Sequence, residues 1–286
     1  MFPKAPDLHK TNKPLVPNGL GVLYVIASTA YLFLLHYFHT PPYISPALTL
    51  AVCILFGGFM GLLDDWMDLR WRFKAFFPLI AAIPLITLAT RLGLRMYMTI
   101  PILGTIDFGL YYYLIIIPLI VTITTNTVNQ LGGLNGLETI CPGIVMIGLM
   151  LTSGLNAILL YVPLIAWLSL AFFNFQGKIF VGNIGSFAIG MTLASFAIIS
   201  ELKTVLLISI LPFIFNSSLI LLNYFFFRNR AAVSFDGKRL FSTHRRSLIT
   251  LVTYYRHLTE RQVVGIISLL VVTSTFAAVL VQWLLL

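Results

Sequence analysis

Three aspartates, Asp64, Asp65 and Asp68, stand at the end of an apolar run in a chain that has only nine acidic residues. If the run is helical, Asp64 and Asp68 are i,i+4 neighbours, so their carboxylates repel unless a cation or basic side chain lies among them. The nearby basic candidates are Arg70, Arg72 and Lys74. The cluster predicts a magnesium or phosphate centre; the alternative is a solvated, charge-balanced helix end.

A second polar segment, residues 126–138, joins two later apolar runs. It carries three asparagines and three glycines, Asn126, Asn129, Asn135, Gly132, Gly133 and Gly136. Glycines let the backbone approach a ligand closely or adopt a positive φ, and the N–H groups of such a turn can hold an anion. The segment indicates an anion-binding turn, with an ordinary helix-capping loop as the alternative.

Two further segments are weaker signals. Residues 180–186 form another glycine-rich turn that contains Asn183, although tight helix packing explains such a turn equally well. The basic loop 238–246 ends in His244, Arg245 and Arg246, whose cationic groups suit a pyrophosphate. A basic loop held at the cytoplasmic side of a membrane accounts for its charge as well.

The composition indicates the elements that must position these segments. Hydrophobic residues make up 59% of the 286 residues and charged residues 9%, far from the roughly 25% of a soluble domain. Crossing a bilayer takes ~20 apolar helical residues. Runs of about this length predict nine spans, near residues 21–39, 46–63, 75–92, 108–125, 139–155, 157–174, 184–200, 204–224 and 263–286. The chain is therefore expected to be an all-α polytopic membrane protein.

The charges predict its orientation. An odd number of spans puts the termini on opposite sides, and an N-terminus in the cytoplasm leaves only Arg91, Arg95 and Lys203 of the 18 basic residues outside. The active site is then at the cytoplasmic face. The pI near 9.7 fits basic loops at an anionic membrane surface, so no nucleic acid is expected as a partner.

Residues 1–286 are read as one integral membrane domain without a cleavable signal peptide. Cys53 and Cys141 fit no disulfide or zinc pattern.

In order along the chain, these segments resemble those of the polyprenyl-phosphate N-acetylhexosamine-1-phosphate transferases, especially the eukaryotic and archaeal dolichyl-phosphate branch. Residues 7–21 resemble the first cytoplasmic loop of that family, residues 64–74 its aspartate pair and basic segment, and residues 126–138 its asparagine-rich signature. Residues 180–185 resemble its metal motif, and His244 with Arg245 the end of its substrate loop.

The resemblance implies transfer of GlcNAc-1-phosphate from UDP-GlcNAc to a polyprenyl or dolichyl phosphate, with release of UMP, as the first step of glycan assembly. Its cofactor would be Mg²⁺, with Mn²⁺ as an alternative. The implied catalytic residues are Asp64, Asp65 and Lys74, and the implied metal ligands are Asn129 and Asn183. The implied substrate-binding residues are Leu8, Asn126, Gly133, Asn135, Glu138, Phe180, His244 and Arg245.

The chain departs from the family pattern in three places. The family has one more helix before the loop that contains Asp7, Asn183 stands where the metal motif has Asp, and Thr243 stands where the branch often has Arg. An amide oxygen is a hard ligand without charge, although Asn183 could instead only cap its helix. The alternatives to the transferase function are a catalytically silent relative of the family and a transporter or flippase. A plasma membrane of a prokaryote or an ER membrane, and a homodimer, are compatible with the resemblance.

Overall fold

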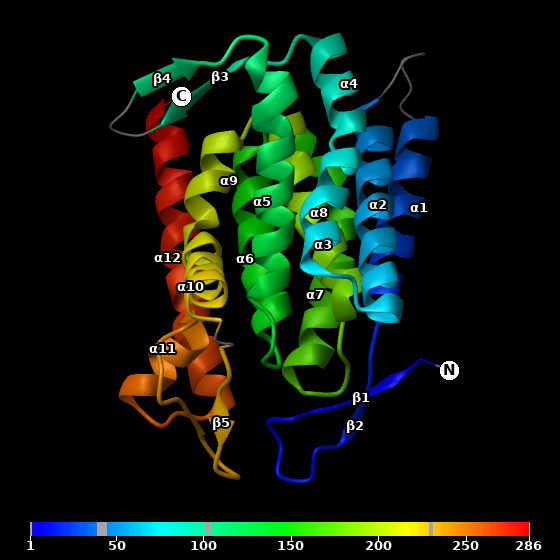
Figure 1. Ribbon diagram of the computed structural model, residues 1–286. Coiled ribbons are helices and arrows are strands. Elements are labelled where there is room, and N and C mark those ends of the chain that lie inside the picture. Colours follow the sequence, from blue (N-terminus) through cyan, green and yellow to red (C-terminus); the bar gives the residue numbers. More distant parts are fainter. Residues whose placement is uncertain (1, 39–44, 101–103, 229–230, 286) are drawn as a thin grey trace.

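The computed structural model describes residues 2–38, 45–100, 104–228 and 231–285. Long helices run side by side between two ends of the molecule, and the chain termini lie at opposite ends (Figure 1). The elements are β1 Lys4–Pro6, β2 Leu15–Pro17, α1 Gly21–Phe38, α2 Pro46–Met67, α3 Trp71–Ala81, α4 Ile83–Leu92, β3 Tyr97–Ile100, β4 Gly104–Asp107, η1 Tyr112–Ile116, α5 Ile117–Gln130, α6 Leu137–Thr152, η2 Gly154–Leu160, α7 Tyr161–Phe175, α8 Gly182–Ile199, α9 Lys203–Ser209, α10 Leu211–Phe227, β5 Ser234–Phe235, β6 Leu240–Phe241, α11 Leu248–Tyr255 and α12 Glu260–Leu285. The expected all-α membrane architecture is confirmed.

The expected count of nine spans is not confirmed. Within the described residues, seven helices are long and apolar enough to cross a bilayer, or eight if α9 and α10, which meet at 56°, form one bent span. The remaining expected span, near residues 139–155, corresponds to α6, which is apolar but only 16 residues long. Pro118 follows the π-helical turn η1, and Pro212 begins α10 just after the bend, so prolines mark two of the irregular spans.

Helix α8 is the centre of the bundle. In α8, 89% of the membrane-spanning stretch is buried inside the protein. In the other long apolar helices of the described residues, this share is at most 56%. Helix α8 packs against α2, α5 and α1, and small residues on both sides allow the backbones to approach. A Cβ on Gly61 of α2 would overlap the backbone of Asn183 and Ile184 at the start of α8. Such close backbone packing is typical of membrane helices, because lipid gives no hydrophobic drive for association.

The end of α2 corrects one part of the sequence interpretation. Ser45 caps the start of the helix by accepting a hydrogen bond from the N–H of Leu48, at 3.1 Å. The helix ends at Met67, and Asp68 adopts a left-handed conformation with φ of 47°. Asp68 is therefore the residue just after the helix, and the regular helical geometry assumed for these two carboxylates ends before it.

The polar elements separate between the two ends as the charges predict. The hairpin β1–β2, the hairpin β5–β6 and helix α11 lie at one end, and β3–β4 lies at the other (Figure 1). At the β3–β4 end, Arg95 forms an ion pair with Glu201 at 2.9 Å, and Lys203 donates to the carbonyl oxygen of Arg95 at 2.8 Å. The three basic residues assigned to the far side of the membrane thus belong to that end.

We expect Gly61→Ala to lower the melting temperature in detergent, because the added methyl group forces α2 away from the backbone of α8. Overpacking of this kind costs about 1–3 kcal/mol. The matched control is Gly265→Ala on α12, where a Cβ meets no atom within 4 Å; Ala is the better helix former there. Equal melting temperatures for the two variants would contradict the close α2–α8 contact.

Candidate functional site

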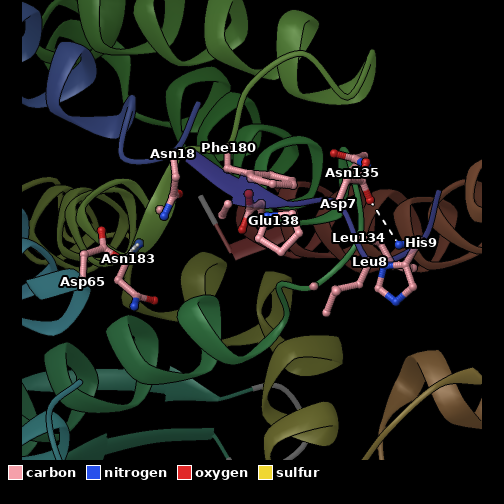
Figure 2. A pocket seen from close by; sticks show the side chains of 14 residues that line it. Asp7, Leu8, His9, Asn18, Asp65, Leu134, Asn135, Glu138, Phe180 and Asn183 are labelled. Atoms are coloured by element: carbon pink, nitrogen blue, oxygen red, sulfur yellow. Dashed lines mark hydrogen bonds between the residues drawn. The ribbon is translucent and has the colours of Figure 1, made fainter. Parts of the chain in front are cut away.

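A cavity of about 300 Å³ opens at the end of the bundle where the N-terminal hairpin lies. Its walls come from the turn between β1 and β2, the end of α2, the turn between α5 and α6, and the start of α8. In Figure 2, one end of the cavity is formed by Asp65 and Asn183, the other by Asp7, Leu8 and His9, and the middle by Glu138 and Phe180.

Backbone hydrogen bonds join the end of the N-terminal hairpin and the start of α1 to the segment that leads into α8. The N–H of Phe180 donates to the carbonyl of Pro17 at 2.8 Å, and the N–H of Gly21 donates to the carbonyl of Val181 at 2.9 Å. Gly182 has a φ of 70°, and a Cβ there would meet Asp65 and Gly19. A glycine at this position therefore permits the turn into α8 directly beside the Asp65 carboxylate.

Asp65 belongs to the cavity. Its carboxylate accepts hydrogen bonds from the backbone N–H groups of Asn183 and Ile184, each at 3.1 Å. These N–H groups belong to the first turn of α8, where the helix dipole also favours negative charge. The position of Asp65 is thus fixed by the start of the most buried helix. Because Val181 precedes the first residue of α8, the suggestion that Asn183 is merely the helix cap is wrong.

Asp64 belongs to the other side of α2. Its side chain is fully buried and pairs with Lys74 of α3 at 2.8 Å, and the same oxygen accepts the N–H of Leu69 at 3.0 Å. This confirms that a basic partner lies among the aspartates. The second carboxylate oxygen of Asp64 is buried and has no hydrogen-bond partner. The two adjacent aspartates therefore face different parts of the protein: Asp65 lines the cavity, and Asp64 contacts α3.

Lys74 lines the second space, a groove of about 910 Å³ between α3, α5 and α10. Arg70 and Arg72 lie at the same groove, and its wall on α5 carries Asn126 and Asn129. Aromatic residues on α3 and α10 complete it, including Trp71 and Phe225, whose rings meet edge to face at 5.3 Å. The groove is basic and polar on one side and apolar on the other, which suits an amphiphilic ligand with an anionic head.

The sequence-predicted residues divide between these two spaces. The cavity is lined by Leu8, Asp65, Gly133, Asn135, Glu138, Phe180 and Asn183. The groove is lined by Lys74, Asn126 and Asn129. The side-chain oxygen of Asn129 accepts a hydrogen bond from Ser186 of α8 at 2.5 Å, so this residue connects the groove to the central helix.

His244 and Arg245 line neither space. The guanidinium group of Arg245 lies over the rings of Tyr254 and Tyr255, at 4.2 and 4.8 Å from their centroids. Burial, with a smaller contribution from the charge of Arg246, lowers the pKa of His244 below its ordinary value. The lowered pKa favours the neutral imidazole of His244.

A cluster at the far end of the cavity has members that the sequence interpretation did not assign. Asp7, buried apart from 2% of its surface, accepts a hydrogen bond from the side chain of Asn135 at 2.7 Å, and Glu260 accepts the backbone N–H of Asn135 at 2.8 Å. Lys10 pairs with Glu260 at 2.8 Å. Asp7 lies inside the recognised N-terminal segment, but nothing local marks Glu260, which comes from α12 far along the chain.

Two groups of oxygen ligands could hold a metal ion. One ligand atom each from Asp7, His9 and Glu260 lies within 4.8 Å of the others. However, Asn135 and Lys10 already donate to those carboxylates. The second group is at the aspartate pair, where Asp64 has an unpartnered buried oxygen and Asp65 lines the cavity beside Asn183. Carboxylate and amide oxygens are ligands that Mg²⁺ accepts, so the ligand types of the second group suit a magnesium ion, while both oxygens of Asp65 also accept N–H groups of α8.

Comparison with known proteins adds independent information. The model of glycosyl transferase family 4 matches residues 47–201. A protein of Saccharolobus solfataricus, provisionally named a UDP-N-acetylglucosamine–dolichyl-phosphate N-acetylglucosaminephosphotransferase, is 33% identical over 272 residues, covering 91% of this chain and 82% of the relative. A Sulfolobus acidocaldarius protein with the same provisional name is also 33% identical, covering 73% and 66%. The protein of that name from Dictyostelium discoideum is 26% identical, covering 73% and 62%.

We expect Lys74→Gln to lower the melting temperature, because the buried Asp64 carboxylate loses its cation. Leaving one buried partner unsatisfied costs about 1–3 kcal/mol. Adding Asp64→Asn should recover most of that loss, since a neutral amide no longer needs the charge. Arg72→Gln is the control, because Arg72 is exposed and no ion pair of this side chain occurs in the described part of the chain. A Lys74→Gln variant as stable as the control would show that the pair has no structural role.

Proposed function

The chain belongs to glycosyl transferase family 4, and from this we propose that it transfers GlcNAc-1-phosphate from UDP-GlcNAc to a dolichyl or polyprenyl phosphate. One observation carries the proposal beyond family membership. Asp65 lines the small polar cavity, whereas its neighbour Asp64 pairs with Lys74, which lines the large amphiphilic groove. A soluble nucleotide sugar and a membrane lipid need two such spaces that meet at one point.

The cavity suits the donor. Phe180 offers a ring face to a base, and Gly133, with a φ of 105° and no atom within 4 Å of a Cβ position, leaves room opposite a flat ligand. Asn135 and Glu138 supply polar groups deeper in the same cavity. Leu8, which is 59% exposed, would cover the ligand from the N-terminal hairpin. We assign the uridine part of UDP-GlcNAc to this space.

The groove suits the acceptor. Its apolar wall would take the first isoprene units, and Arg70, Arg72 and Lys74 would attract the phosphate. Asn126 and Asn129 offer neutral polar groups on the wall of the groove that the lipid would enter. A phosphate monoester has a second pKa of about 6 and is already largely a dianion at pH 7. Lys74 therefore contacts the phosphate while the buried Asp64 holds Lys74 in position, and no base is needed to create the nucleophile.

The reaction is then a displacement at phosphorus. An oxygen of the lipid phosphate attacks the phosphorus that carries the sugar, a new P–O bond forms, and the P–O bond to the uridine-bearing phosphate breaks. UMP leaves with the electron pair, and the product is the lipid pyrophosphoryl sugar. Bound at Asp64, Asp65, Asn129 and Asn183, Mg²⁺ would neutralise the pyrophosphate charge. For His244 and Arg245 to contact the sugar or diphosphate, Arg245 would have to leave its tyrosines.

We place the site at the cytoplasmic face of the membrane, because most basic residues belong to that end of the molecule. UDP-sugars do not cross bilayers, so sealed vesicles of known sidedness test this assignment. Turnover that required permeabilisation of inside-out vesicles would contradict it.

The central test is UMP release by the purified protein with UDP-GlcNAc, polyprenyl phosphate and Mg²⁺. We expect activity in the wild type and a loss of at least roughly 100-fold in Asp65→Asn, because a neutral amide would hold the Mg²⁺ that neutralises the pyrophosphate less strongly than a carboxylate does. Asp107→Asn at the opposite end of the bundle is the control. An inactive wild type with a panel of UDP-sugars would favour the catalytically silent alternative.

A magnesium titration tests the proposed role of Asn183. We expect Asn183→Asp to reach half-maximal UMP release at a lower Mg²⁺ concentration, because a carboxylate attracts a divalent cation more strongly than an amide does. Asn18→Asp provides the comparison, since Asn18 lines the same cavity but is not an assigned ligand. If the titration curves of Asn183→Asp and wild type superimpose, Asn183 is not a metal ligand.

A further inference from the structure

Asn174, near the end of α7, is a fully buried polar residue that lines neither the cavity nor the groove. Its side-chain oxygen accepts the backbone N–H of Gly136 at 2.8 Å and the hydroxyl of Thr139 at 3.0 Å. Its side-chain nitrogen donates to the carbonyl of Ile179 at 2.9 Å and weakly to Glu138 at 3.4 Å. Every hydrogen-bonding position of the amide is therefore occupied.

These partners lie in two separate walls of the cavity. Gly136 directly follows Asn135 and precedes α6, which begins with Leu137 and Glu138. Ile179 directly precedes Phe180, on the segment between α7 and α8. One amide thus connects the asparagine-rich turn to the aromatic wall, beside the hydrogen bond between the Glu138 carboxyl group and the backbone of Val181.

We propose that Asn174 is a positioning residue for the nucleotide-sugar donor, holding the turn at Gly136 and the segment at Ile179 at the separation that admits the uridine. This inference rests on the proposed function for the identity of the donor. Asn174 lies outside the segments 126–138 and 180–185 that carry the resemblance.

The burial of Asn174 argues for this specific role. Neighbouring residues of α7, including Phe172 and Phe173, are exposed apolar side chains suited to lipid. An apolar residue at position 174 would avoid the cost of burying an amide. However, it would leave the N–H of Gly136 and the carbonyl of Ile179 without these partners. A fully satisfied buried network specifies one arrangement of the groups it joins, and here those groups are cavity walls.

The effect should be selective for the donor. The groove is built from α3, α5 and α10, and among the described residues no hydrogen bond joins the Asn174 side chain to these helices. A change at Asn174 therefore alters the cavity and leaves the acceptor groove in place.

Asn174→Asp is a small change of side chain that weakens the link between the two walls. The new carboxylate can still accept from Gly136 and Thr139, but its second oxygen faces the carbonyl of Ile179 and repels it. We expect the KM for UDP-GlcNAc, and the Kd for UDP-GlcNAc measured by calorimetry without acceptor, to rise roughly 10-fold, the equivalent of about 1.4 kcal/mol. The KM for polyprenyl phosphate should stay within twofold of the wild-type value.

Low pH should partly restore this variant. A buried carboxyl beside a carbonyl has a raised pKa, and its protonated form can donate to Ile179 as the amide does. Glu138 also faces position 174, and burial raises its pKa to about 7, so it titrates in the same window in wild type and variants. The donor affinity of Asn174→Asp, divided by that of wild type at each pH, should therefore improve between pH 8 and pH 6. Asn174→Leu cannot donate at any pH, so it should show the loss without the recovery.

Trp167→Phe is the matched control, because it removes another buried hydrogen bond of α7, from the indole N–H to the carbonyl of Thr139 at 2.8 Å. We expect it to lower the melting temperature with little change in donor KM. An Asn174→Asp variant with unchanged donor KM and Kd would overturn the inference, whatever its melting temperature. A wild type that binds UDP-GlcNAc but releases no UMP would refute the proposed function, and the Kd of the variant would still decide the role of Asn174.

Discussion

The site depends on the contact between α2 and α8. Gly61 allows the end of α2 to lie against the first turn of α8, and Asp65 on the next turn of α2 then accepts the free N–H groups of that turn. The carboxylate is thereby fixed by the most buried helix of the bundle. Because these N–H groups have no partner within α8, the carboxylate also completes the helix start.

The same end of α2 separates two environments by one residue. Successive residues on a helix point about 100° apart, since 3.6 residues make a turn. Asp65 therefore lines the polar cavity while Asp64 turns towards Lys74 and the amphiphilic groove. A donor that is soluble in water and an acceptor that is soluble in lipid can approach one point from different sides. The aspartate pair thereby joins the cavity to the groove.

Much of the site could be predicted from the sequence because its residues lie in short local segments. Glycine spacing and polar residues among apolar runs marked the turn at Gly133 and Asn135, whereas the assignment of these residues and of Phe180 to a substrate followed from the resemblance to the family. The prediction failed where local reasoning assumed a regular continuation. Asp68 leaves the helix. The role that the resemblance implies for His244 and Arg245 stays a prediction, and Arg245 lies on the tyrosines of α11. Both features depend on how the end of a helix or a loop packs, and the hydrophobic periodicity of the sequence does not encode that packing.

The sequence by itself determined the membrane class, the separation of charges between two ends and the acidic centre, because each follows from the cost of placing polar groups in lipid. Only the tertiary structure decided which segments meet. Asn174 is distant in the sequence from Gly136, as Glu260 is from Asn135, and no local pattern marks either of them. Their contacts exist because the packing of α7 and α12 brings them to the cavity, and packing is a property of the whole chain.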